Sequence, residues 1–213
     1  MSLFTAVAMA PRDPILGLNE QFAADTHPNK VNLGVGVYFD DSGKLPLLQC
    51  VQRAKKPLMK NPAARGYLPI DGIAAYDAAV KSLVFGADSE PLKSGRVATI
   101  QSLGGTGGLK VGADFLKRLN PGATVLISEP SWDNHRALFG NAGFAVESYA
   151  YYNAATRSLD FDGMLASLNA AAPGSIVVLH ACCHNPTGYD LSTAQWEQAI
   201  AVLKARGLTP FLD

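Results

Sequence analysis

The chain has 213 residues, of which 48% are hydrophobic and 17% are charged, and its 18 basic residues equal its 18 acidic ones. A chain of this length and apolar content can bury a large core, which excludes a disordered or fibrous protein. The balanced charge leaves no basic surplus for the phosphates of nucleic acid, so no nucleic-acid partner is expected.

The N-terminal third of the chain, up to about residue 70, is rich in proline and irregular in pattern. Proline at this density favours extended and turn structure over long helices. A regular pattern begins at Ile73, where apolar residues recur at helical spacing as far as Val84. Gly86 stands where a C-terminal helix cap belongs, so we expect the helix to end there.

Strands and helices alternate over the rest of the sequence. Short apolar runs predict strands at Val97–Ile100, Thr124–Ser128, Phe144–Tyr149, Ile176–Leu179 and Thr209–Leu212. Three helices are predicted between them, entered at Gly104–Gly108, at the cap Asp160, and at the capping box of Ser192 with Gln195. Continuous apolar strands separated by amphipathic helices predict an α/β fold, with a mainly parallel sheet covered by helices on both faces.

Cysteine usage and the first residues favour a cytoplasmic protein. Cys50, Cys182 and Cys183 form no even disulfide framework, which suits a reducing compartment. No basic residue precedes Arg12, so the apolar start is not typical of a signal peptide. The uncharged run 163–189 is interrupted by proline, asparagine and histidine, and we expect no membrane partner.

Ligands of parallel α/β sheets bind beyond the carboxyl ends of the strands. One candidate there is the glycine run Gly104–Gly108, where a turn into a helix exposes backbone N–H groups to an anion, most naturally a phosphate. The run is not a P-loop, because the required Gly-Lys-Ser/Thr is absent, and it is not a dinucleotide fingerprint, because Lys110 stands in place of the third glycine. A phosphate site and a plain tight turn into a helix both remain open.

A second candidate is the loop Glu129–His135 after a predicted strand. Trp132 offers a flat face for stacking on a planar ring, or it caps the core. His135 is a candidate general base, or a structural or solvated loop histidine.

A third candidate is the segment His180–Gly188. His180, Cys182 and His184 would share one face of a continued strand, which raises the possibility of a metal site. Adjacent cysteines cannot both reach one ion from an extended strand, and no second ligand pair exists, so no metal is expected. Asn185 at the strand end either bonds a ring hydroxyl or phenolate, or braces its own turn.

Asp213 is the fourth candidate, because a carboxylate at the end of an apolar strand needs a cation or a strong donor. A protonated pyridinium nitrogen would meet that need and would make the ring an electron sink. A residue further along a longer chain would meet it equally. Together the four candidates supply what a pyridoxal phosphate site requires.

Six ordered motifs resemble the class I pyridoxal-phosphate aminotransferases of the aspartate and aromatic-amino-acid subgroup. They are Asp13–Leu18, Val31–Tyr38, Tyr67–Gly72, Gly104–Gly107, Pro130–His135 and Cys182–Gly188. The stretches Arg96–Gln101 and Lys204–Asp213 are most similar to the bacterial aromatic-amino-acid enzymes. The resemblance implies the type I fold of pyridoxal-phosphate-dependent transferases, incomplete here, and pyridoxal 5'-phosphate as cofactor.

The resemblance also implies roles for single residues. Gly105 and Thr106 would bind the cofactor phosphate, and Tyr67 would reach the phosphate of the neighbouring subunit in a homodimer. Trp132 would stack on the ring, Asn185 would bond its oxygen and Asp213 would pair with its nitrogen.

Four further positions follow from the same resemblance. Gly36, together with Trp132 and Asn185, would line the carboxylate end of the substrate, and His135 would lie beside the ring-nitrogen aspartate. Pro130 and Pro186 correspond to prolines that follow cis peptide bonds in the family.

Family members continue well past residue 213, and their Schiff-base lysine lies beyond that point. Lys110, Lys117 and Lys204 lie in predicted helices and do not match the lysine motif. We therefore expect no catalytic residue in this chain, which would be the truncated N-terminal half of an aminotransferase and inactive alone. Residues 1–46 would form an N-terminal arm and small-domain segment, and 47–213 the first part of the large cofactor-binding domain.

The expected function is transfer of an amino group between an aromatic or dicarboxylic L-amino acid and a 2-oxo acid such as 2-oxoglutarate. Two alternatives remain: an aspartate aminotransferase, and a non-catalytic fragment that binds a phosphorylated ligand or a partner chain.

Overall fold

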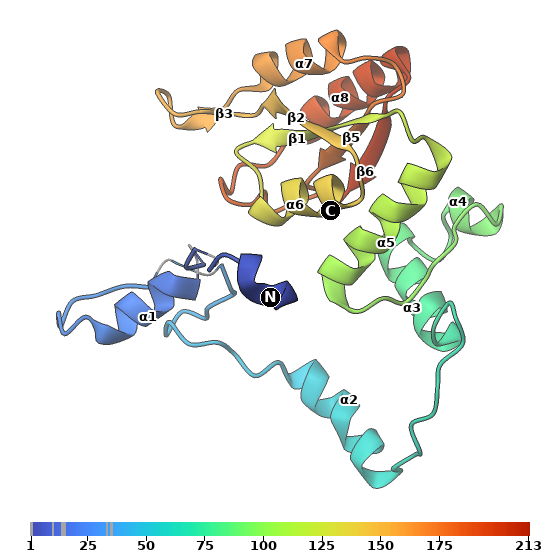
Figure 1. Ribbon diagram of the computed structural model, residues 1–213. Coiled ribbons are helices and arrows are strands. Elements are labelled where there is room, and N and C mark those ends of the chain that lie inside the picture. Colours follow the sequence, from blue (N-terminus) through green and yellow to red (C-terminus); the bar gives the residue numbers. More distant parts are fainter. Residues whose placement is uncertain (1, 10, 14–15, 33, 35) are drawn as a thin grey trace. The chain divides into compact units, whose positions relative to one another are not determined.

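The computed structural model describes residues 2–9, 11–13, 16–32, 34 and 36–213 (Figure 1). Within the motifs of the resemblance, Pro14, Ile15, Leu33 and Val35 therefore lie outside the described residues. The chain divides into two compact units, Met1–Gly66 and Tyr67–Asp213. The expected boundary after residue 46 concerns the domains of a longer protein, and it stays a prediction.

The first unit contains more helix than its prolines suggest. A 3₁₀ turn η1 spans Leu3–Ala6, and helices α1 and α2 span Leu16–Ala24 and Gln49–Lys60. Pro57 lies inside α2. One proline removes a single backbone hydrogen bond, which a helix can accommodate near its end. The spacing of the prolines therefore did not predict α2.

The second unit is built on a parallel sheet with strand order β2-β1-β5-β6. Its strands are β1 Thr124–Glu129, β2 Ala145–Ala150, β5 Ile176–Leu179 and β6 Thr209–Leu212. All three pairings are parallel, and Leu179 of β5 lies opposite Leu212 of β6. Four of the five predicted strands are thus confirmed, with small shifts at their ends.

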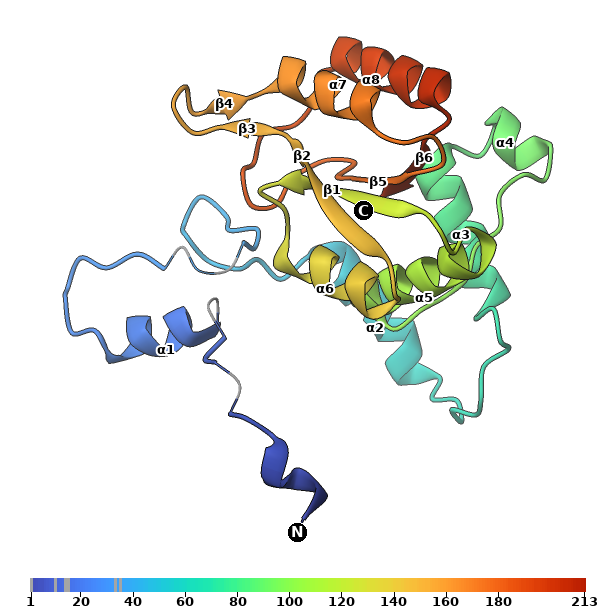
Figure 2. The same ribbon diagram turned by 45° about the horizontal axis from the view of Figure 1, so that its top comes forward.

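Helices cover both faces of this sheet, as predicted (Figure 2). Helices α5 (Gly104–Leu119) and α6 (Asp133–Asn141) lie on one face, and α7 (Phe161–Ala170) and α8 (Thr193–Arg206) on the other. Side chains of β1 alternate between two apolar clusters: Val125 and Ile127 pack on the α5–α6 side, and Leu126 on the α7–α8 side. Packing on both faces explains the continuous apolar runs Val125–Ile127 of β1 and Ile176–Leu179 of β5.

Local caps place the helices as expected. The Asp160 carboxylate accepts the Gly163 N–H at 3.0 Å to open α7, and Ser192 with Gln195 forms the capping box of α8. Gly207 ends α8 in the left-handed conformation, with φ at 62°. Helix α3 (Ala74–Phe85) ends at Gly86, and the short α4 spans Glu90–Lys93.

Three features differ from the prediction. Val97–Ile100 has no regular secondary structure and pairs with no strand in the described part of the chain, so the predicted strand is wrong. The segment after Trp132 is not a loop but helix α6, which the short apolar pattern did not reveal. A small hairpin, β3 (Tyr152–Asn153) with β4 (Ser158–Leu159), was also missed. No helix among the described residues is both long and apolar enough to cross a membrane.

The contact between α5 and β6 predicts opposite effects for one substitution at two helical glycines. A Cβ added at Gly112 would lie 2.8 Å from Cε2 of Phe211, whereas one added at Gly140 of α6 would meet nothing within 4 Å. We expect Gly112→Ala to lower the free energy of unfolding by about 1–3 kcal/mol through overpacking. Gly140→Ala should raise it by up to about 1 kcal/mol through helix propensity.

Urea denaturation of both variants measures these changes. Equal effects of the two substitutions would contradict the close packing of α5 on β6.

Candidate active site

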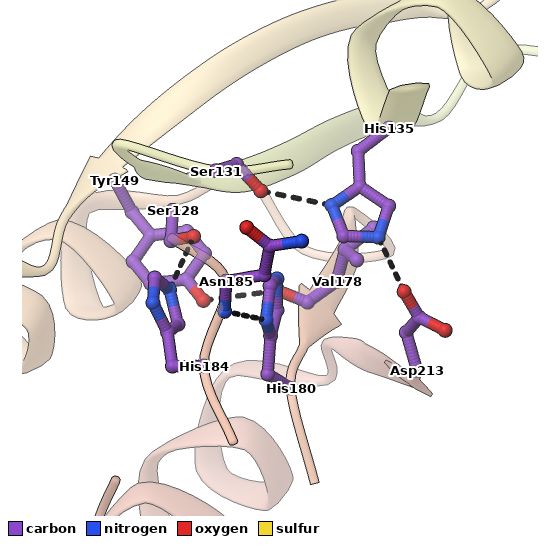
Figure 3. A network of polar contacts seen from close by, with 9 residues as sticks. All are labelled: Ser128, Ser131, His135, Tyr149, Val178, His180, His184, Asn185 and Asp213. Atoms are coloured by element: carbon purple, nitrogen blue, oxygen red, sulfur yellow. Dashed lines mark hydrogen bonds and ion pairs between the residues drawn. The ribbon is translucent and has the colours of Figure 1, made fainter. Parts of the chain in front are cut away.

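The carboxyl ends of β1, β5 and β6 bring polar side chains to one edge of the sheet (Figure 3). Ser131 follows β1, His180 follows β5, and Asp213 follows β6. The β5–β6 ladder continues to Asp213, whose N–H donates to the Leu179 carbonyl at 2.9 Å and whose carbonyl accepts the Ala181 N–H at 2.9 Å. The backbone of Asp213 is therefore fixed.

The central contact joins Asp213 to His135, with 2.7 Å between Oδ2 and Nε2. The His135 side chain is fully buried in the first turn of α6, and its Nδ1 lies 2.9 Å from Ser131 Oγ. Because an ionised carboxylate only accepts, Nε2 carries the hydrogen, and Nδ1 accepts from the Ser131 hydroxyl. His135 is thus a structural histidine of a helix, and the alternative of a solvated loop histidine is wrong.

The other oxygen of Asp213 is open to a ligand. Its Oδ1 has no hydrogen-bond partner among the described residues, and the side chain is 33% exposed. Trp132 caps the N-terminus of α6 beside this pair, and its ring is perpendicular to that of His135 with centroids 5.4 Å apart. Trp132 is half-buried. The edge therefore offers an unused carboxylate oxygen and an indole.

His180 links this pair to Asn185. Its Nδ1 accepts the backbone N–H of Asn185 at 2.9 Å, so the hydrogen of the neutral ring lies on Nε2. That Nε2 is buried and has no partner among the described residues. The centroids of the His180 and His135 rings lie 5.1 Å apart. Burial is the main cause that lowers the pKa of His180, and the neighbouring His135 lowers it further. His180 is therefore a neutral ring with an unused donor.

Hydrogen bonds and ring stacking hold the His184 side chain in place. Its Nε2 is hydrogen-bonded to Ser128 Oγ at 2.9 Å and its Nδ1 to Thr187 Oγ1 at 2.8 Å. The ring stacks on Tyr151 at 3.9 Å and on His180 at 4.2 Å. Burial lowers the pKa of His184 to about 4, and the neighbouring His180 adds to the effect. His184 is therefore neutral at physiological pH.

The histidines and cysteines of this segment do not share one face. Strand β5 ends at Leu179, after which the chain turns, so His180 and His184 stack on each other while Cys182 is exposed. Both ring nitrogens of His184 already have hydrogen-bond partners. Among the described residues, no group of three or more histidine, cysteine, aspartate or glutamate side chains has a metal-binding arrangement.

The sequence did not single out Ser128, Tyr151 or Asp190, which all contact His184 in this segment. Asp190 accepts the backbone N–H of His184 at 2.9 Å and that of Cys183 at 2.8 Å, and these two bonds lower its pKa. The available signals were a serine near the end of an apolar strand and an aspartate close after the Asn185 turn.

Gly105 and Thr106 lie in the first turn of α5 and are exposed. No side chain caps this end of the helix, and the N–H groups of Gly105 and Thr106 have no hydrogen-bond partner among the described residues, whereas that of Gly104 donates to the Ser102 carbonyl at 3.1 Å. Helix α5 ends at Leu119, shortly before β1 begins, so its N-terminus points toward the carboxyl edge of the sheet. This turn makes no hydrogen bond or ring contact with Asp213 or Trp132, but it faces the same edge.

One predicted site residue of the second unit, Tyr67, has no contact with this cluster. Tyr67 is fully exposed, with no hydrogen bond or ring contact to other described residues. Gly36 belongs to the first unit, and a Cβ added there would meet nothing within 4 Å. The structure thus gathers Trp132, His135, Asn185 and Asp213. The peptide bonds before Pro130 and Pro186 are cis, as the resemblance implied.

Residues 28–213 match the family model of aminotransferase class I and II. The chain belongs to this family. Over 213 residues it is 63% identical to the aspartate aminotransferase of Pseudomonas aeruginosa, covering 100% of this chain and 54% of that protein. Over 212 residues it is 50% identical to the aromatic-amino-acid aminotransferase of Escherichia coli, covering 99% of this chain and 53% of that protein.

A crystal structure with the same fold is that of the aromatic-amino-acid aminotransferase from Burkholderia pseudomallei, covalently bound to pyridoxal phosphate. The TM-score is 0.95 at 65% identity, covering 100% of this chain and 53% of that one. The family resemblance and the fold class are therefore confirmed. The chain spans about half the length of the curated relatives it matches.

The environment of His184 predicts a pH dependence of stability. An unfolded histidine titrates near 6.5, whereas His184 in the folded chain titrates at about 4. Between these values the unfolded chain binds a proton that the folded chain does not. The contribution of neutral His184 to the free energy of unfolding is therefore complete above about pH 6.5. The free energy of unfolding falls as the pH decreases from there toward 4.

Urea denaturation at pH 7 and pH 4.5 measures this loss, which should be smaller in His184→Gln than in the wild type. An equal loss in both proteins, or an NMR titration of the His184 ring near 6.5, would contradict the assignment.

Proposed function

We propose that the whole protein containing this chain is an aminotransferase that uses pyridoxal 5'-phosphate. The observation that carries the proposal is the Asp213 carboxylate, oriented by buried His135 and left with one oxygen for a ligand. Such a carboxylate suits a protonated ring nitrogen, because its negative charge favours the charged form of a nearby basic group.

The unpaired polar groups along this edge fit the cofactor. Asp213 Oδ1 and His180 Nε2 both lack partners among the described residues, and Trp132 is only half-buried. At the N-terminus of α5, the space beside Gly105 is open, and unpaired N–H groups with the helix dipole favour a phosphate. A ligand with a basic ring at one end and a phosphate at the other matches this arrangement.

Each residue then has a role that its surroundings support. Asp213 would hold the proton on the ring nitrogen, and His135 would keep the carboxylate oriented. Trp132 would stack on the ring, Asn185 would donate its carboxamide hydrogen to the ring oxygen, and Gly105 with Thr106 would bind the phosphate. When bound, the cofactor supplies an electron sink for chemistry at the substrate α-carbon.

The substrates we propose are an aromatic or dicarboxylic L-amino acid and a 2-oxo acid such as 2-oxoglutarate. Similarity to both aspartate and aromatic-amino-acid aminotransferases supports this range. We further propose that Gly36 lines the substrate carboxylate with Trp132 and Asn185. The full exposure of Tyr67 supports its contact with the partner site of a homodimer. The three free cysteines support a cytoplasmic location.

Replacing Asp213 tests the proposed chemistry. In the whole protein, Asp213→Asn should lower kcat for transamination at least about 100-fold, because a neutral amide cannot hold the proton on the ring nitrogen. The assay uses 2-oxoglutarate with aspartate and, separately, with phenylalanine. The matched control is Asp114→Asn, which removes an exposed carboxylate paired with Lys110. An Asp213 variant as active as this control would contradict the proposal.

The 213-residue polypeptide alone should show no transamination. Lys110 pairs with Asp114, and Lys117 Nζ donates to the carbonyls of Pro121 and Gly143 at 2.7 and 2.6 Å, so neither lysine is free as a nucleophile. Robust turnover by the polypeptide would overturn this expectation. A visible absorption band with added cofactor that resists borohydride would instead support binding without a lysine linkage.

A further inference from the structure

Side chains hold three successive backbone N–H groups in the turn that carries Asn185. The N–H of Cys183 donates to Asp190 Oδ2 at 2.8 Å, and that of His184 to Oδ1 of the same carboxylate at 2.9 Å. The N–H of Asn185 donates to His180 Nδ1 at 2.9 Å. The turn that presents Asn185 is therefore held by side chains and not by strand pairing.

The first of these residues has an unfavourable backbone conformation. Cys183 has φ at 54°, in the left-handed region that residues other than glycine rarely adopt. A residue persists there only when surrounding contacts impose the conformation. The Asp190 carboxylate supplies such contacts, because its two oxygens accept the N–H of Cys183 and the N–H of the next residue.

The side chain of His184 has partners of its own. The His184 ring is fixed by Ser128, Thr187 and the stack on Tyr151. In Figure 3 Asn185 lies between the His184 and His135 rings, with its carboxamide directed away from the His180 ring. Asp190 is thus the side chain that holds the backbone N–H groups of the two residues ahead of Asn185.

We propose that Asp190 is a positioning residue for Asn185. It acts through the backbone of Cys183 and His184 and sets the direction in which the Asn185 carboxamide meets a ligand. This role deepens the proposed function and rests on it, because Asn185 is assigned there to the oxygen of the cofactor ring. Asp190 itself is exposed and contacts neither Asp213 nor Trp132.

The test is Asp190→Asn in the whole protein. The amide keeps one acceptor oxygen but turns an NH2 group toward a backbone N–H, so one of the two bonds is lost. Hydrogen exchange of the Cys183 and His184 amides should become about tenfold faster. The pH midpoint of the visible band of the bound cofactor should move in the same direction as in Asn185→Ala, and kcat/KM should fall about tenfold.

A double-mutant cycle separates positioning from general destabilisation. If Asp190 acts through Asn185, then Asp190→Asn should change kcat/KM and the visible band little in the Asn185→Ala background. The matched control is Asp160→Asn, which removes the same charge from a carboxylate that also accepts a backbone N–H. Asparagine caps a helix as well as aspartate, so this control should behave as wild type.

Effects that multiply in the double variant, or unchanged amide exchange in Asp190→Asn, would overturn the proposal. Failure of the proposed function gives a different result: the wild-type protein would show neither a cofactor band nor transamination, while amide exchange would still report on the contact of Asp190 with the turn.

Discussion

The candidate site depends on a hydrogen bond between Asp213 and His135, two residues far apart in the sequence. A carboxylate at the end of an apolar strand is unfavourable unless a donor meets it, and the buried imidazole is that donor. The pairing requires β6 to lie beside β5, and α6 to begin directly after β1. The order of the parallel sheet therefore places Asp213 within hydrogen-bond distance of His135.

The charge of the site follows from the burial of its histidines. His180 and His184 stack in the turn after β5, and burial lowers the pKa of both, so neither ring adds positive charge near Asp213. The negative charge of Asp213 is then available to a cation brought by a ligand. At the N-terminus of α5 the preference is opposite, because unpaired N–H groups and the helix dipole favour an anion. This pair of preferences distinguishes a phosphorylated pyridine from a simple anion or a simple cation.

The turn that carries Asn185 is held by residues that are not themselves candidates for ligand binding. Ser128, Tyr151 and Asp190 contact the turn that carries Asn185, and they come from β1, from the segment after β2 and from the loop before α8. These contacts hold His184, the residue directly before Asn185. A site on this edge is thus shaped by the loops while the sheet holds their ends in place.

Local pattern was sufficient for much of the fold. Apolar runs located β1, β5 and β6, and the capping residues Asp160, Ser192 and Gly207 located the ends of α7 and α8, because these signals act within a few residues. The ordered motifs, Gly104–Gly107 and Cys182–Gly188 among them, identified the family. Tertiary structure alone decided the rest. It left Val97–Ile100 unpaired, placed His135 in a buried helix rather than a loop, and joined Asp190 to the backbone of Cys183. Each of these depends on partners distant in sequence, and a hydrogen-bond partner or a tautomer is determined only when folding brings such groups within about 3 Å.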